Sequence, residues 1–315
     1  MHDMVKNIVT QSHFVPNKSY LANFTDDNGK LHIYRFDGVP TSLEKVKKIK
    51  INPKKFCRER FIYESSKYEV NFLEKVLESI EYSYKNILEE KILTKKSISD
   101  ADKKIISNFI SSLEFRTQVS RNQQNTFTED ILLKVKQIEK QFLKEKKSTT
   151  HQEIVNYLNN NLPFVDLIFQ SIFISRWQFC DFQFLFINDD NIYFVTSDNP
   201  VTHYDFTLFN SPYSPPPNST TIEVIVPLTS KIVLLINNIN LKGYKGIDYN
   251  FVREVNNRVI ANHPKMYIIS PRVISEEYYK NTIQRFRQSF LLRGLRKNLD
   301  AKQESRMKKY GIVRK

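Results

Sequence analysis

The hydrophobic pattern of this 315-residue chain changes its period once, near residue 176. Between residues 64 and 175, apolar residues recur about every 3.6 positions, which is typical of amphipathic helices. Between residues 176 and 271, short β-branched and aromatic runs are separated by turn residues, which is typical of strands. Helices that precede strands, instead of alternating with them, predict an α+β fold. We expect a mixed or antiparallel sheet with flanking helices in the C-terminal half, one domain over residues 1–295, and a basic tail over residues 296–315.

The same patterns predict the individual elements. The clearest helix is expected over residues 68–91, and a second begins at Ser99, where Asp102 stands three residues on as in a capping box. Further helices are expected over residues 128–142, 151–174 and 249–262, and from residue 275. Strands are expected over residues 31–36, 42–53, 182–187, 191–196, 222–226, 231–236 and 266–269.

The composition narrows the classes of function. Only 6 residues are glycine, and no glycine-rich loop of the kind that cradles nucleotide phosphates is present. Cys57 and Cys180 have no neighbouring cysteine, so we expect buried thiols in a reducing cytosol, not a zinc site or disulfide framework. The first residues lack a long apolar run, and no apolar run is long enough to span a bilayer. We therefore expect a cytoplasmic protein with no membrane partner.

The net charge of +14 favours a polyanionic partner such as RNA or DNA. An AT-rich genome also produces lysine-rich surfaces without any such partner. From residue 272 onward, 13 Lys and Arg stand against four acidic residues, so this segment carries most of the excess. Such localisation makes a nucleic-acid contact more credible than uniform charge does. The expected contact residues are Arg293, Arg296, Lys297, Arg306, Lys308 and Lys309.

One strand is expected to end in a polar turn that presents an acid and an amide. After a run of β-formers at residues 193–196, the chain continues as Ser197-Asp198-Asn199-Pro200. Because proline closes the turn, Asp198 and Asn199 are candidates for a site at the strand end. A strand-end Asp-Asn-Pro is also ordinary turn chemistry, so a structural role stays open.

Three further polar residues stand in apolar surroundings. His13 precedes a turn fixed by Pro16, and a neutral histidine can exchange protons near pH 7. Glu81 interrupts the apolar stripe of the first helix, and Arg116 extends the buried face of the second. The opposite charges predict either a buried ion pair that fixes the helix register or an arginine that meets an anion, oriented by the glutamate.

Several of these stretches together resemble a known family. They are His13-Phe14-Val15-Pro16, Arg116-Thr117, Trp177-Gln178-Phe179, Ser197-Asp198-Asn199-Pro200-Val201 and Val226-Pro227-Leu228-Thr229-Ser230. Over roughly residues 11–270, the chain resembles domain-of-unknown-function family 4238, a family of bacterial proteins. The resemblance implies no reaction, and it does not cover the basic tail. It implies one shared site with these members: His13, Arg116, Asp198, Asn199 and, as a plausible fifth, Glu81.

Two hypotheses from different classes follow. In the first, the protein binds nucleic acid and cleaves or modifies phosphodiester bonds as a nuclease-like hydrolase, with His13 as general acid or base and Arg116 neutralising phosphate charge. Asp198 would hold a divalent metal or orient His13, and Asn199 would position the substrate. A mechanism without metal is equally open, because no second acid stands at ligand spacing beside Asp198. In the second, the protein is a non-catalytic nucleic-acid-binding or regulatory module, and the same residues form a structural hydrogen-bond cluster.

Overall fold

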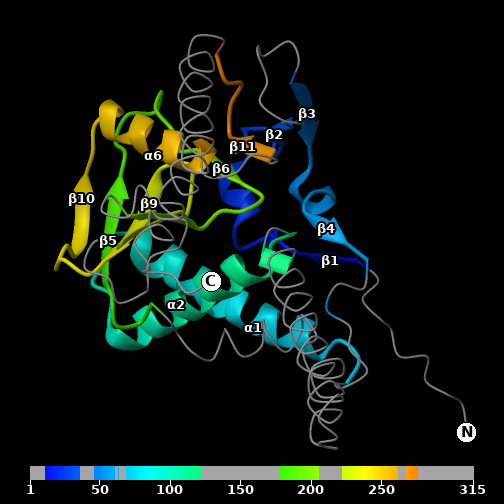
Figure 1. The fold of residues 1–315 in the computed structure, drawn as a ribbon, viewed down its shortest axis with the longest axis horizontal. Helices are drawn as coiled ribbons and strands as arrows, with labels where there is room; N and C mark the ends of the chain where they lie inside the picture. Colours follow the sequence, from blue (N-terminus) through cyan, green and yellow to red (C-terminus); the bar gives the residue numbers. More distant parts are fainter. Residues whose placement is uncertain are drawn as a thin grey trace, which may run out of the picture. The chain divides into compact units, whose positions relative to one another are not determined.

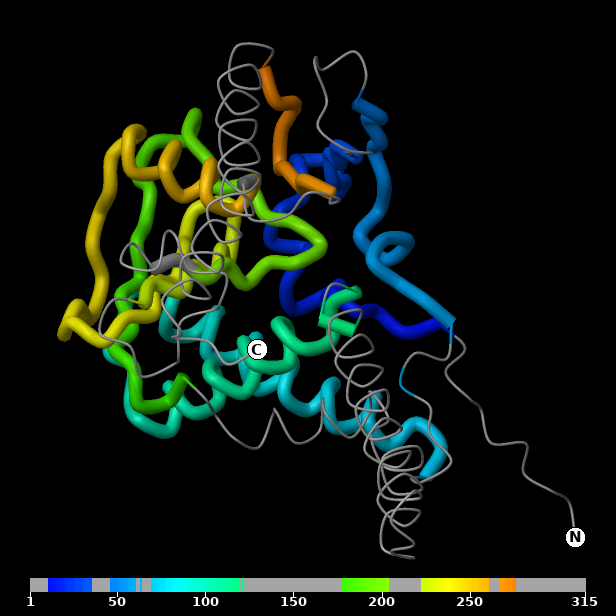
Figure 2. Tube along the Cα trace, in the orientation of Figure 1, coloured from blue at the N-terminus to red at the C-terminus, as the bar shows by residue number. Residues whose placement is uncertain are grey.

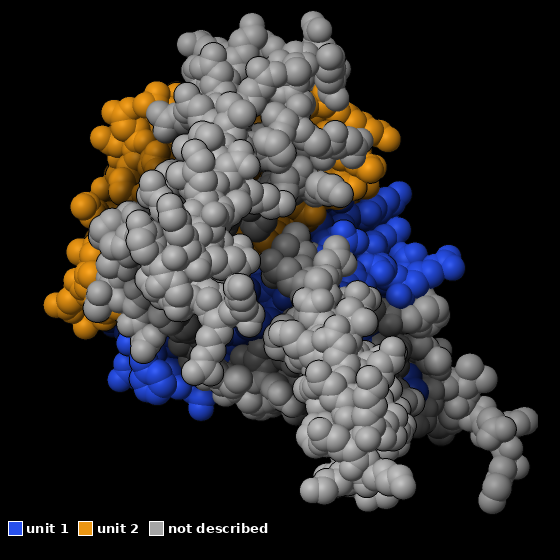
Figure 3. Space-filling view, in the orientation of Figure 1, with its two compact units in different colours: residues 1–20, 54–179 blue, residues 21–53, 180–315 orange. Residues whose placement is uncertain are grey.

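The computed structural model describes residues 11–35, 46–60, 63, 69–118, 120–121, 177–205, 222–261 and 267–275. The chain divides into two compact units, which Figure 3 colours separately. Unit 1 comprises residues 1–20 and 54–179, and unit 2 comprises residues 21–53 and 180–315. Each unit is therefore discontinuous in sequence, and each is described by itself. That residues 1–295 act as one domain stays a prediction.

Two helices form the framework of unit 1 (Figure 1). Helix α1 spans Phe72–Ile87 and continues as the π-helix η4, Leu88–Ile92, while helix α2 spans Asp100–Phe115. The two helices pack together, and the rings of Tyr84 and Phe109 stack with their centroids 3.7 Å apart. Both helices form where the apolar period predicts them, although the expected first helix ends in a π-turn and begins four residues late.

Helix α2 begins with the capping box that the sequence predicts. The Ser99 hydroxyl accepts from the backbone N–H of Asp102, and the Asp102 carboxylate accepts from the backbone N–H of Ser99. Lys91 Nζ also donates to the Asp102 carboxylate at 2.6 Å. Burial raises the pKa of Asp102, but the hydrogen bonds from Lys91 and Ser99 outweigh burial and leave the pKa below its ordinary value. The cap therefore also fixes the turn between α1 and α2.

A short antiparallel ribbon lies at the start of unit 1. It consists of β1, Ser12–His13, and β4, Arg58–Glu59. Ser12 lies opposite Glu59, and His13 lies opposite Arg58. Just before β4, Cys57 adopts a φ of 53°, the left-handed region that a β-carbon makes costly. The chain thus enters β4 through a residue with a strained backbone.

Unit 2 contains two sheets (Figures 1 and 2). The five-stranded sheet has the order β10-β5-β9-β8-β7, in which β10 and β5 run parallel and the other pairs run antiparallel. The four-stranded sheet has the order β3-β2-β11-β6 and is antiparallel. The strands are β2 Leu31–Arg35, β3 Lys47–Ile51, β5 Asp181–Phe186, β6 Thr196–Ser197, β7 Thr202–Asp205, β8 Ile222–Pro227, β9 Ile232–Asn237, β10 Gly243–Gly246 and β11 Tyr267–Ser270.

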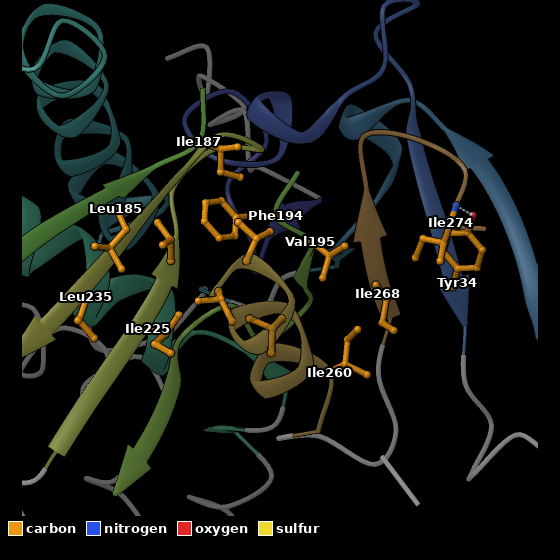
Figure 4. Packing of buried hydrophobic residues seen from close by; sticks show 14 of the residues in the cluster. Tyr34, Leu185, Ile187, Phe194, Val195, Ile225, Leu235, Ile260, Ile268 and Ile274 are labelled. Atoms are coloured by element: carbon orange, nitrogen blue, oxygen red, sulfur yellow. Dashed lines mark hydrogen bonds between the residues drawn. The ribbon is translucent and has the colours of Figure 1, made fainter. Parts of the chain in front are cut away.

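The core of unit 2 draws on both sheets and on α6, Tyr249–Ala261 (Figure 4). Leu185 and Leu235 come from the five-stranded sheet, and Ile268 comes from β11. Strand β9 is buried along its whole length, which explains the apolar run of its first five residues, 232–236. At the edge of the cluster, the Tyr34 hydroxyl accepts from the backbone N–H of Ile274 at 2.8 Å.

The strand expected over residues 191–196 is wrong except at its end. Only Thr196–Ser197 forms a strand, β6, and it pairs with β11 instead of returning along β5. The preceding backbone is held in other ways, because Phe194 N donates to a loop carbonyl and Val195 N donates to Oδ1 of Asn256. Phe194 and Val195 are buried, and Ile192 and Tyr193 are partly buried against the same core, so these β-forming side chains contribute to packing without a strand ladder.

The α+β class and the mixed sheet are confirmed. The helices expected over residues 128–142 and 151–174 and after residue 275, together with the basic tail, lie outside the described residues. Cys57 and Cys180 are buried thiols, as the sequence predicts. Within the described ranges, we find no helix with the length and apolar character needed to cross a membrane.

Candidate functional site

Two hydrogen bonds hold His13 in the ribbon of unit 1. The hydroxyl of the buried Tyr63 donates to the carbonyl oxygen of His13 at 3.0 Å, and His13 Nε2 lies 3.3 Å from the carbonyl oxygen of Lys54. A carbonyl oxygen can only accept, so Nε2 carries the proton. In the neutral ring, Nδ1 then keeps its lone pair. The half-buried His13 therefore offers a base at Nδ1.

The pKa of His13 lies below its ordinary value of 6.5. Burial is the largest cause, and the positive charges of Arg116 and Arg58 lower the pKa further. The hydrogen bond to Lys54 and the charge of Glu81 act in the opposite direction but do not compensate. The ring is therefore neutral at pH 7, and a neutral imidazole is the form that can accept a proton.

Glu81 and Arg116 form the ion pair that the two helix faces predict. Arg116 caps the C-terminus of α2, and its Nη2 donates to Oε1 of Glu81 in α1 at 2.8 Å. The other carboxylate oxygen of Glu81 accepts from the hydroxyl of Ser19 at 3.0 Å. The Arg116 side chain is only 1% exposed, against 23% for Glu81. The pair thus links α1, α2 and the N-terminal segment, with Glu81 as the more accessible member.

The guanidinium of Arg116 is not fully satisfied by this pair. Its Nε is buried and has no hydrogen-bond partner among the described residues. Burial is the largest single influence on the pKa of Arg116 and acts to lower it, but the charge and hydrogen bond of Glu81, together with the charges of Tyr63 and Glu74, outweigh burial and raise the pKa overall. Arg116 is therefore charged at all working pH values and has one donor to spare, although that donor faces the protein interior.

Asp198 lies at the end of β6 in unit 2 and is buried. Its Oδ1 accepts from the backbone N–H of Tyr267 at 3.2 Å, which extends the pairing of β6 with β11 by one residue. Burial raises the pKa of Asp198 to about 7, and the backbone hydrogen bonds only partly oppose this shift. The carboxyl therefore keeps its proton through most of the acidic range. Among the described residues, Asp198 belongs to no group of three or more His, Cys, Asp and Glu side chains that could hold a metal ion, and no other such group occurs there.

Asn199 is also buried, and its backbone is fixed by the preceding serine. The Ser197 hydroxyl accepts from Asn199 N at 3.1 Å and donates to Asn199 O at 2.9 Å. Upstream, Asn256 of α6 accepts from Val195 N and donates to Tyr193 O, each at 2.9 Å. The polar turn is therefore held at both ends by side chains that replace a strand partner.

The structure brings three of the candidate residues together in unit 1. Glu81 and Arg116 are paired, and the charges of both act on His13. Asp198 and Asn199 belong to unit 2, and their membership of the same site stays a prediction. The tail residues expected to contact nucleic acid, Arg293, Arg296, Lys297, Arg306, Lys308 and Lys309, lie outside the described residues.

Sequence reasoning missed the residues that hold His13 and Glu81 in place. Ser19, Lys54 and Tyr63 act through a hydroxyl or a backbone carbonyl, and such contacts produce no periodic signal in a sequence. The only available sign was that residues 56–63 follow neither a helical nor a strand pattern. Irregular segments of this kind often carry functional groups.

Comparison with known proteins identifies a family but no characterised relative. The family model described as "Protein of unknown function (DUF4238)" matches residues 11–272. The matched range contains His13, Glu81, Arg116, Asp198 and Asn199. No curated protein and no solved structure matches the chain.

Proposed function

We propose that this chain, which belongs to the DUF4238 family and inherits no known reaction from it, binds nucleic acid and cleaves its phosphodiester bonds with His13 as general base. The observation that carries the proposal is the state of His13. It is neutral at pH 7, half-buried, and hydrogen-bonded through Nε2 so that Nδ1 is free to take a proton. The net charge of +14 supplies the attraction for a polyanion.

The reaction is a displacement at phosphorus. A hydroxyl group gives its proton to Nδ1 of His13 while its oxygen forms a bond to phosphorus. The bond between phosphorus and the leaving oxygen breaks, and the leaving oxygen takes a proton from water. If the nucleophile is water, the product is a phosphomonoester, and if it is the 2′-hydroxyl of RNA, the product is a 2′,3′-cyclic phosphate.

Arg116 supports this reaction without contacting the substrate. Because the Arg116 side chain is 1% exposed, it acts through its charge and by holding Glu81, not by touching a substrate. Its positive charge acts to lower the pKa of His13, whereas Glu81 acts to raise it, so the neutral state of the ring depends chiefly on burial. We therefore assign Arg116 a positioning role.

A second candidate function is a non-catalytic binding module, and the burial of Arg116 favours it. A fully buried guanidinium paired with a glutamate on a neighbouring helix is an ordinary way to fix helix register. Under this alternative, the contacts of His13 with Tyr63 and Lys54 only fasten the N-terminal segment. The two functions differ in what His13 does to a bound nucleic acid.

Cleavage of labelled RNA and DNA, single-stranded and duplex, distinguishes the two functions. The wild-type chain is expected to cleave at least one of these substrates. The His13→Gln variant keeps an N–H donor for Lys54 but lacks the base, so its rate should fall by roughly 10²-fold or more. Its melting temperature should change little, because the side chain is only half-buried.

His203→Gln, which removes a half-buried histidine of unit 2, is the matched control and should cleave at the wild-type rate. Two results contradict the proposal. One is a wild-type chain that binds these nucleic acids and leaves all of them intact. The other is a His13→Gln variant that cleaves at the wild-type rate.

A further inference from the structure

The two residues of β4 have opposite environments although they are neighbours in sequence. Glu59 accepts two hydrogen bonds from the guanidinium of Arg121, at 3.0 and 2.6 Å, and its cross-strand partner Ser12 is buried. Arg58 is exposed, and with the described residues its side chain forms no ion pair and no hydrogen bond. The ribbon is therefore anchored through one face and presents Arg58 on the other.

His13 shares this second face with Arg58. The two residues are direct partners in the antiparallel register, and such partners place their β-carbons roughly 5 Å apart on the same side of a ribbon. Consistent with this proximity, the charge of Arg58 acts on the protonation of His13. The short helix η3, Pro53–Lys55, supplies the carbonyl that binds His13 and adds two exposed lysines. A base and an exposed guanidinium therefore stand side by side at a basic edge.

We propose that Arg58 binds the phosphate of a nucleic-acid substrate and thereby places the phosphodiester against Nδ1 of His13. This inference rests on the proposed function and supplies the substrate contact that the deeply buried Arg116 cannot make. A guanidinium can donate two parallel hydrogen bonds to phosphate oxygens, and its charge counters the charge that builds up there during displacement. Glu59 and Arg121 then act as positioning residues, because they hold the strand that carries Arg58.

Binding of a short labelled oligonucleotide to the full-length chain tests this contact directly. The measurement uses the His13→Gln background, so that no substrate is consumed, and compares Arg58, Arg58→Ala and Arg58→Lys over a range of salt concentrations. Arg58→Ala should weaken binding roughly fivefold to tenfold and should reduce the slope of log K against log salt by about 0.7–0.9, the loss expected for one phosphate contact. Arg58→Lys should restore the slope and only part of the affinity.

Lys75→Ala is the matched control, since it removes an equal charge from an exposed position on α1 of the same unit. It should leave the affinity and the slope unchanged. An Arg58→Ala variant that behaves like Lys75→Ala overturns the inference. So does an otherwise wild-type Arg58→Ala chain that cleaves with an unchanged KM and kcat, and in that case the function of His13 survives. If Arg58 controls binding but the wild-type chain cleaves nothing, the contact stands and the proposed reaction falls.

Discussion

The pKa values of His13 and Asp198 are shifted from their ordinary values by the same cause, burial, acting on groups of opposite charge. Burial disfavours a cation and lowers the pKa of His13, and it disfavours an anion and raises the pKa of Asp198 to about 7. Shifts of this kind concentrate at functional sites, although structural burial produces them too. Each residue therefore has a pH signature by which its role can be tested.

Replacing Asp198 with asparagine should stabilise the protein at alkaline pH. The folded carboxyl keeps its proton up to about pH 7, whereas the unfolded carboxyl loses it near 3.8, so stability from this group is lost as pH rises through 7. Asparagine cannot ionise and still accepts from Tyr267 N. The difference in the free energy of unfolding, variant minus wild type, should grow by roughly 1–3 kcal/mol between pH 5 and pH 8.

Denaturant unfolding at several pH values measures this difference. The exposed Asp27, replaced in the same way, is the control for the loss of one carboxyl group. A difference for Asp198→Asn that stays constant from pH 5 to pH 8 would mean that the carboxyl is ionised throughout.

At the scale of secondary structure, the sequence predicts best where one local rule acts alone. The stripes of α1 and α2, the capping box at Ser99 and the opposed charges of Glu81 and Arg116 all follow from spacing along a helix, and the structure contains them. The strand expected over residues 191–196 fails because its backbone partners come from far along the chain. Only the tertiary fold decides that Asn256 replaces a neighbouring strand.

The Glu81–Arg116 pair should fix the packing of the two helices more than it adds to the free energy of unfolding. Glu81→Ala leaves Arg116 buried without its principal counter-charge, so it should lower the free energy of unfolding by about 3 kcal/mol. The double variant Glu81→Leu with Arg116→Met should recover most of this loss, because it removes both charges. A thermal or denaturant melt measures the recovery. If the double variant is no more stable than Glu81→Ala, the loss does not come from an uncompensated arginine.

The same variants separate structure from catalysis. If the pair only fixes helix register, the double variant should also recover cleavage. If the charges of the pair also act on His13, the double variant should fold but show a lower pKa for His13 in its pH–rate profile, because Glu81 raises this pKa more than Arg116 lowers it.

Asn256 and Asn257 offer a matched pair of substitutions on one helix. Asn256→Ala leaves Val195 N and Tyr193 O without their buried partner, so we expect a loss of roughly 2–4 kcal/mol. Asn257 is buried as well, but its Nδ2 has no hydrogen-bond partner among the described residues, so Asn257→Ala should cost less than about 1 kcal/mol. Equal losses in a denaturant melt would show that the two bonds of Asn256 do not hold the segment before Asp198.

At the scale of the whole molecule, the distribution of charge can be predicted from the sequence, whereas the pairing of His13 with Arg58 in the β1–β4 ribbon cannot. Nine of the 14 excess positive charges fall after residue 271, and this needs only counting. The pairing of His13 with Arg58 depends on a two-residue ribbon that joins segments 45 positions apart, entered through the strained Cys57. No local pattern marks such a ribbon, so the sequence could suggest His13 but not its neighbour.

Removing the basic tail tests its share of binding separately from the ribbon. Truncation after Gly294 removes eight Lys and Arg and two acidic residues. At low salt, the truncated chain should bind RNA or DNA at least roughly tenfold more weakly and with a smaller salt slope. The cleavage rate at saturating substrate should stay unchanged, because the tail contributes affinity and not chemistry. Unaltered affinity at low salt would exclude a role of the tail in binding polyanions.

The most direct test of the central claim is a nitrogen-15 spectrum of the histidine rings, recorded with and without an oligonucleotide. The chain contains 6 histidines, and His13→Gln assigns the one in question. We predict that His13 titrates below 6.5, carries its proton on Nε2 when neutral, and shifts its Nδ1 resonance when the oligonucleotide binds. A ring protonated on Nδ1, or an Nδ1 resonance unchanged by saturating oligonucleotide, would contradict the account.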